Sequence, residues 1–180
     1  FLFLAIAWIT KPEYRNWLLF CDGLYIAMLV TKRLRPAYAF ALVLIAGIGM
    51  RYISLRQTPF GSTSDMLPLV TRAVETFLAH ENPYRYHTIN MPFATYQLPL
   101  TYLPLTWLAY LPSHLLHADL RWTNLFADIA SASLLWLGFN RKSRIASYLP
   151  AVLASIWFLN PYFSHRMDSE ISVFGLILSI

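Results

Sequence analysis

Only one cysteine, Cys21, stands among the 180 residues, so no disulfide can form within this chain. The sequence also contains no Cys-x-x-Cys pair, no His-Glu-x-x-His motif and no glycine-rich phosphate loop. It therefore lacks the usual signatures of thiol redox enzymes, zinc proteases and P-loop nucleotide-binding proteins. Charged residues are scarce as well, at 13% of the chain, whereas soluble domains carry about 25%. This shortage argues against an ordinary soluble domain.

The chain is instead rich in apolar residues, which make up 57% of the sequence. Apolar runs cover residues 1–9, 17–31, 37–54, 120–139, 145–163 and 171–180. Because about 20 apolar residues in a helix cross the bilayer core, we predict an all-α fold, a polytopic transmembrane helix bundle. Gly47 and Gly49 should permit close contact between its helices. The chain begins at Phe1 and ends inside an apolar run, so we expect residues 1–180 to be one transmembrane domain truncated at both ends.

The net charge of +5 comes largely from two basic clusters that flank apolar runs: Lys32, Arg33 and Arg35, and Arg141, Lys142 and Arg144. Such clusters favour the cytoplasmic side of a membrane. If both are cytoplasmic, the run 37–54 leads the chain out and the run 120–139 brings it back. The proline-rich stretch 97–112 then does not cross, and we expect a kinked helix on the outer surface. Residues 55–119 become an extracytoplasmic loop with juxtamembrane helices. Short basic clusters also make nucleic acid an unsuitable partner.

Residues 65–80 of this loop have the spacing of an amphipathic helix, with Leu67, Val70, Val74, Phe77 and Leu78 on one side. Ser64 or Asp65 can cap its start, and we expect it to lie on a membrane surface. Asn82-Pro83 should end it. Residues 84–96 have no clean period, so we predict a loop there.

Asp65 is the first candidate catalytic residue, because a carboxylate at a helix start can take a proton from a hydroxyl or bind a divalent cation. The alternative is that it only caps the helix. Asp168 and Glu170 are candidate partners, in a polar stretch after His165 and Arg166. An arginine can bind a phosphate with two hydrogen bonds. The alternative there is an ordinary solvated loop.

Aromatic and polar residues elsewhere have two interpretations each. Tyr84, Tyr86 and Tyr96, with Phe93, could stack on a sugar ring or form an interfacial aromatic belt. Asn124 and Asp128 share a helix face inside an apolar run, where they could hold helices together or line a cavity. His114 and His117 are too few for a zinc site without further ligands.

The order of these features resembles the GT-C superfamily of integral-membrane glycosyltransferases. The resemblance covers residues 64–170 and rests on Asp65 after an apolar run, an amphipathic helix, Asn82-Pro83-Tyr84, the segments YQLPL at 96–100 and LPL at 103–105, and the later Arg166 and Asp168. It is similar to the polyprenyl-phosphate-sugar-dependent kind, including mannosyltransferase-like and aminoarabinose-transferase-like families. His80-Glu81 stand where many relatives have glycine before the Asn-Pro-Tyr turn.

The resemblance implies a hexosyltransferase that moves a sugar from a polyprenyl-phosphate carrier to an acceptor hydroxyl of a glycan, lipid or protein in the cell envelope. Asp65 would be the base, and Asp168 the second acid or a metal ligand. The donor would contact Arg166, His165, Glu170, Tyr84, Tyr86 and Tyr96. A divalent cation is compatible with the two acids, and no nucleotide cofactor is expected.

The expected location is the inner membrane, with the site on the extracytoplasmic side and membrane lipids as neighbours. Two other functions remain open: a transporter or flippase with Asn124 and Asp128 in its pathway, and a non-catalytic membrane scaffold.

Overall fold

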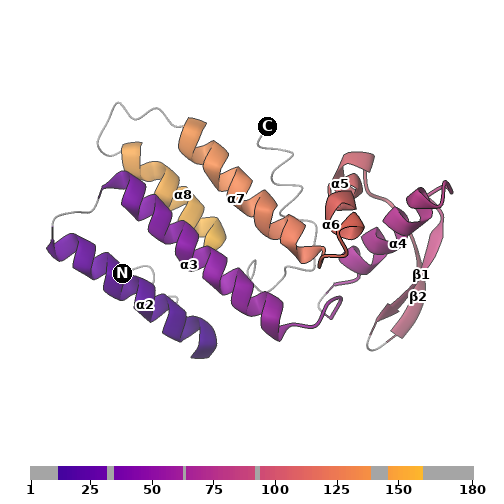
Figure 1. Cartoon of the computed structure of the whole chain (residues 1–180), viewed down its shortest axis with the longest axis horizontal. Coiled ribbons are helices and arrows are strands. Elements are labelled where there is room, and N and C mark those ends of the chain that lie inside the picture. Colours follow the sequence, from indigo (N-terminus) through magenta and orange to yellow (C-terminus); the bar gives the residue numbers. More distant parts are fainter. Residues whose placement is uncertain (1–11, 32–34, 63, 92–93, 139–145, 160–180) are drawn as a thin grey trace. The chain divides into compact units, whose positions relative to one another are not determined.

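The computed structural model describes residues 12–31, 35–62, 64–91, 94–138 and 146–159 (Figure 1). The chain divides into two compact units. Of the described residues, unit 1 contains those up to Gln57 and those from Ile129 onward, and unit 2 contains those from Thr58 to Asp128. Helix α7 (Arg121–Gly138) begins in unit 2 and continues, from Ile129, in unit 1.

Unit 1 is built around helix α3 (Pro36–Gln57), which packs against α2 (Pro12–Val30) and α8 (Leu149–Phe158), the latter preceded by the short turn η1 (Ala146–Tyr148). Gly47 lies against Phe158 of α8 and Gly49 against Trp17 of α2, and neither position has room for a Cβ atom. The Trp17 indole also donates a hydrogen bond to the Ala46 carbonyl at 2.9 Å. The prediction that these two glycines permit close helix contact is therefore confirmed.

A buried arginine joins α3 to the end of α8. Arg51 is fully buried, donates a hydrogen bond to the Phe158 carbonyl at 2.8 Å, and lies 4.4 Å from the centre of the Phe158 ring. The last carbonyls of a helix have no partner inside the helix and carry a partial negative charge. The guanidinium supplies both the missing donor and the opposite charge.

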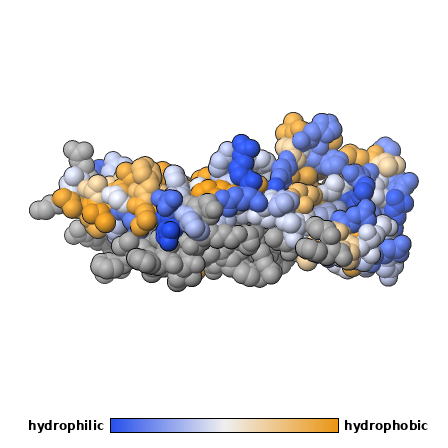
Figure 2. Space-filling model, turned by 90° about the horizontal axis from the view of Figure 1, so that it is seen from below, coloured by the Kyte–Doolittle hydropathy of each residue, from blue (hydrophilic) through white to orange (hydrophobic). Residues whose placement is uncertain are grey.

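Unit 2 contains helix α4 (Met66–Leu78), a hairpin of strands β1 (Tyr86–Met91) and β2 (Ala94–Pro99), and the short helices α5 (Pro104–Leu108) and α6 (Leu111–Leu115). The strands are antiparallel, with Ile89 opposite Tyr96 and Tyr86 opposite Pro99. The apolar side of α4 faces β1, α5 and α6. Hydrophilic residues predominate on the surface over α4 and the hairpin (Figure 2).

The core of unit 2 includes Leu67, Val70 and Val74, each with no exposed surface. Burial of one such side chain contributes about 1.5–3 kcal/mol, so these three residues account for much of the attachment of α4. The helix was expected to lie on a membrane surface, and that prediction is wrong because protein covers its apolar side. Phe77 and Leu78, expected on the same side, remain about two-fifths exposed, at 42% and 40%.

The all-α prediction is also wrong, because the chain forms the β1–β2 hairpin where we expected a loop. Alternate β1 residues, beginning with His87 and Ile89, are buried while Tyr86, Thr88 and Asn90 are exposed. This period of two is the pattern of a strand that covers a core on one face.

The polytopic transmembrane bundle is contradicted as well. Among the described residues, only α3 is a helix long and apolar enough to cross a membrane. Helix α2 carries Asp22, which is buried, and α7 carries Arg121, Asn124 and Asp128, also buried. Because of these polar side chains, neither helix is apolar enough to cross a membrane. Helix α2 begins at Pro12, so the polar residues before the apolar run 17–31 are helical as well.

The stretch 97–112 does not form the single kinked helix that we expected. It begins in β2 and continues into α5 and the start of α6, helices of five residues each. Five residues of helix extend about 7.5 Å, far less than the thickness of a bilayer core. The expectation that this stretch does not cross a membrane agrees with these lengths.

Candidate functional site

The carboxylate of Asp65 is held by a tyrosine from the hairpin. Asp65 occupies the N-cap position of α4, yet its side chain makes no capping hydrogen bond. The adjacent Ser64 hydroxyl accepts from the Met66 backbone N–H at 3.2 Å. Tyr96 of β2 instead donates its hydroxyl to Asp65 Oδ2 at 3.2 Å. The cap is therefore made by Ser64, and Asp65 is available for another role.

The same contact changes the acidity of the phenol. Partial burial raises the pKa of Tyr96, and the negative charge and hydrogen bond of Asp65 raise that pKa further. A phenolate beside a carboxylate would place two negative charges together, so the pair favours a protonated phenol. Tyr96 therefore remains a hydrogen-bond donor to Asp65 throughout the neutral pH range.

The three candidate tyrosines do not gather around one point. The Tyr84 hydroxyl accepts a hydrogen bond from the Trp107 indole at 3.2 Å, and the two rings are in edge contact. Tyr86 is 69% exposed on β1. The pairing of Tyr86 with Pro99 and of Ile89 with Tyr96 places Tyr86 and Tyr96 on opposite faces of the hairpin. Only Tyr96 is joined to Asp65. Phe93 lies outside the described residues.

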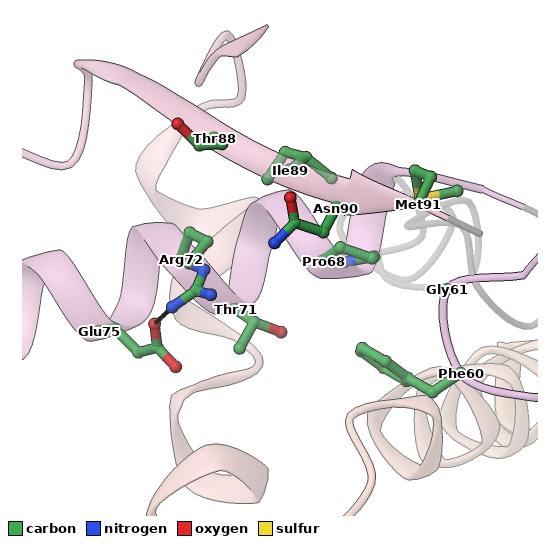
Figure 3. A pocket seen from close by; sticks show the side chains of 10 residues that line it. All are labelled: Phe60, Gly61, Pro68, Thr71, Arg72, Glu75, Thr88, Ile89, Asn90 and Met91. Carbon is green, nitrogen blue, oxygen red and sulfur yellow. Dashed lines mark hydrogen bonds and ion pairs between the residues drawn. The ribbon is translucent and has the colours of Figure 1, made fainter. Parts of the chain in front are cut away.

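An open groove runs between α4 and β1 (Figure 3). It consists of two adjoining hollows of about 490 and 580 Å³, and both are lined by Arg72, Glu75, Thr88 and Asn90. Phe60, Gly61 and Pro68 lie at the end where α4 begins. Asp65 precedes Pro68 by about one helical turn and does not itself line either hollow.

Two ion pairs line the groove. Arg72 contacts Glu75 at 2.8 Å, as the dashed line in Figure 3 shows, and Arg85 contacts Glu81 at 2.6 Å. All four side chains are more than two-fifths exposed. Exposed pairs of this kind contribute about 0–1 kcal/mol, so a ligand can rearrange them at little cost.

The polar residues of α7 make a structural contact. The Tyr110 hydroxyl donates to Asn124 Oδ1 at 2.6 Å, and Tyr110, Asn124 and Asp128 are all buried. A short bond between two buried groups satisfies a polar atom that would otherwise destabilise the core. Asn124 and Asp128 were expected either to hold helices together or to line a cavity. The contact with Tyr110 favours the first interpretation over a transport pathway.

Several predicted site residues lie outside the described residues, namely His165, Arg166, Asp168 and Glu170. The proposed pairing of Asp65 with Asp168 is therefore a prediction that this structure does not test. Within the described part of the chain, no three histidine, cysteine or acidic side chains gather as a metal site. His114 and His117 were the two histidines discussed as possible zinc ligands. His117 lies just after α6, with a φ of 52°.

The sequence interpretation missed the polar lining of the groove, above all Arg72, Glu75, Thr88 and Asn90. Arg72 and Glu75 lie on the polar side of the predicted helix, and the sequence analysis assigned them no function. Thr88 and Asn90 fell in the stretch taken as a loop. The alternation of polar and apolar residues in YHTINM was the signal that could have placed them together on one strand face.

No family model, curated protein or solved structure matches this chain in the comparisons with known proteins. The candidate function therefore depends on the residues themselves.

Proposed function

We propose that this chain belongs to a membrane-bound glycosyltransferase, which moves a sugar from a polyprenyl-phosphate carrier to an acceptor hydroxyl at the extracytoplasmic face. The observation that carries the proposal is the Asp65–Tyr96 pair. A carboxylate at a helix start is relieved of capping by Ser64 and oriented by a phenol, about one helical turn before Pro68, which lines the end of an open groove. A general base needs this combination of fixed position and access.

The reaction breaks the bond between the anomeric carbon and the carrier phosphate, which leaves with the bonding electron pair. A new bond forms between the anomeric carbon and the acceptor oxygen, whose proton passes to Asp65. Tyr96 holds the carboxylate in the orientation that receives the proton. The resemblance to the GT-C superfamily assigns the leaving phosphate to Arg166 and His165, with Asp168 as second acid or metal ligand and Glu170 nearby.

Helix α3 supports the proposed membrane location, because it is long and apolar enough to cross a membrane. The basic residues Lys32, Arg33 and Arg35 precede α3 and favour the cytoplasmic side. Thr58 and the residues after it would then reach the other side, where lipid-linked sugar donors and envelope acceptors would be used.

Asp65→Asn tests the proposal. The amide keeps the size of the side chain and can still accept the Tyr96 hydrogen bond, but it cannot take a proton. We expect sugar transfer from a radiolabelled polyprenyl-phosphate sugar to fall by about 10²–10⁴-fold, measured with the full-length protein in membranes.

The matched control is Ser64→Ala, which removes the cap and retains the carboxylate. It should cost about 1 kcal/mol of helix stability while transfer continues. Wild-type transfer by Asp65→Asn, or equal loss of transfer in both variants, would show that Asp65 is not the base.

A further inference from the structure

The groove between α4 and β1 has a flat aromatic ring at each end and polar groups between them. Phe60, 42% exposed, lies where α4 begins, and Tyr86, 69% exposed, lies toward the end of α4. From Pro68 to Ala79 the helix extends about 16 Å, so the groove is long rather than round. An exposed ring offers a flat apolar surface of the kind that suits the C–H face of a sugar.

The Phe60 ring is held by a contact with a cation. The Arg121 guanidinium lies 5.8 Å from the centre of the ring, and Arg121 also donates to the Thr58 carbonyl at 2.6 Å. Both contacts lie within unit 2. A ring held in this way loses little freedom when a ligand stacks on it.

Asn90 presents a directed donor to the groove. The Thr95 hydroxyl donates to Asn90 Oδ1 at 3.0 Å, which fixes the orientation of the amide. Its nitrogen then points toward α4, on the side of Arg72, as Figure 3 shows. The Thr71 hydroxyl and the Glu75 carboxylate lie across from it on α4.

The charges along the groove cancel. Arg72 is paired with Glu75, and Arg85 is paired with Glu81. A lining with equal numbers of exposed opposite charges has no net attraction for a phosphate. It does offer closely spaced donors and acceptors, which is what a chain of neutral hydroxyl groups requires.

We propose that this groove binds a neutral oligosaccharide, which rests on the proposed function in that the oligosaccharide is the acceptor of the transferred sugar. Its reacting hydroxyl lies at the Phe60 end, near Asp65, and the rest of the chain extends along α4 to Tyr86. Asn90, Arg72 and Glu75 bind hydroxyl groups, and the two rings stack on sugars at either end.

The test measures direct binding of maltotriose, chitotriose and mannotriose to the full-length protein by saturation-transfer NMR and calorimetry. The protein is held in nanodiscs, because glycoside detergents would compete for the groove. At least one trisaccharide should bind. Asn90→Ala should weaken that binding roughly fivefold, the effect of one lost hydrogen bond. Asn90→Asp, which has the native shape and no donor, should weaken it similarly.

Gln97→Ala is the matched control, since Gln97 is exposed on β2 opposite Thr88 and does not line the groove. It should bind as the wild type does. Failure of all three trisaccharides to bind, binding unaffected by either Asn90 variant, or preferential binding of inorganic phosphate would each overturn the inference.

Asp65→Asn separates this inference from the proposed function. That variant should bind the trisaccharide normally and transfer sugar about 10²–10⁴-fold more slowly. Normal binding with undiminished transfer would contradict the role of Asp65 as base and leave the groove assignment in place. Transfer that depends on Asp65 without trisaccharide binding would contradict the groove assignment alone.

Discussion

Ser64 and Asp65 are neighbours that divide two tasks which one residue often performs at a helix start. Ser64 accepts the Met66 N–H, and Asp65 accepts the Tyr96 hydroxyl. The sequence allowed either residue to be the cap, because both have an oxygen at the right distance from the backbone. Only the position of Tyr96, on a strand that was not predicted, decides between them.

The Tyr96 phenol should report on the charge of Asp65. Because the carboxylate raises the pKa of Tyr96, Asp65→Asn should lower that pKa toward its usual value of about 10. NMR of tyrosine labelled with ¹³C at Cζ would follow the titration, with Tyr96→Phe to assign the signal among 11 tyrosines. An unchanged Tyr96 titration in Asp65→Asn would mean that the two groups do not interact in solution.

The raised pKa of Tyr96 also makes the stability of the folded state depend on pH. Folding raises the pKa of Tyr96, so the protonated phenol stabilises the folded state below about pH 10. That contribution is lost as the pH rises through the higher folded-state pKa. Asp65→Asn should reduce this loss.

His80 occupies a backbone conformation that favours glycine. It follows the last turn of α4 with a φ of 58°, where Glu81 N–H donates to Thr76 O and His80 N–H donates to Phe77 O. This is the Schellman arrangement, in which glycine is usual. His80→Gly should therefore raise the stability of unit 2 by up to about 1 kcal/mol.

Chemical unfolding followed by circular dichroism would measure this effect. Ala79→Gly is the matched control, since Ala79 has an ordinary φ of −77° and glycine there should destabilise by about 0.5–1 kcal/mol. Destabilisation by His80→Gly of the same size as in the control would contradict the left-handed conformation.

At the scale of elements, helix α4 could be predicted from the sequence and the hairpin was not. The apolar positions from Leu67 to Val74 repeat with the helical period, and the same positions are buried. The hairpin lacks the usual turn signal, since no Asn-Gly or Asp-Gly pair separates Met91 from Ala94. Its strands are also short, and prolines surround them. A two-stranded hairpin of this size depends on packing against α4, which local sequence does not reveal.

Gly47 and Gly23 provide a test of helix packing within unit 1. A Cβ at Gly47 would collide with Phe158, including its Cβ, whereas a Cβ at Gly23 meets nothing within 4 Å. Alanine improves helix propensity by about 1 kcal/mol at either site. Overpacking costs about 1–3 kcal/mol and applies only to Gly47→Ala. The melting temperature of Gly47→Ala should therefore lie several degrees below that of Gly23→Ala. Equal melting temperatures would show that α3 and α8 are not in close contact.

Within the described part of the chain, apolar composition predicted more spans than the structure contains. Long apolar runs were read as crossings, but α7 buries Arg121, Asn124 and Asp128, and α2 buries Asp22. Apolar runs of 10–18 residues serve equally as core helices, and the difference depends on what the polar residues contact. Asn124 has a partner in Tyr110, a contact between segments that the sequence does not place together.

The orientation of α3 supplies the final prediction. The basic residues Lys32, Arg33 and Arg35 lie just before this helix, and positive charges are retained on the cytoplasmic side. Thr31, exposed at the end of α2, should then be cytoplasmic, while Thr101, exposed in unit 2, should face outward. In a Cys21→Ala background, an impermeant maleimide should label Thr101→Cys in intact cells and Thr31→Cys only after permeabilisation. The outer-face location of Asp65 requires this pattern, because Asp65 and Thr101 belong to the same unit. Labelling of Thr31→Cys alone in intact cells would place the Asp65–Tyr96 pair in the cytoplasm, where a lipid-linked donor on the outer face could not reach it.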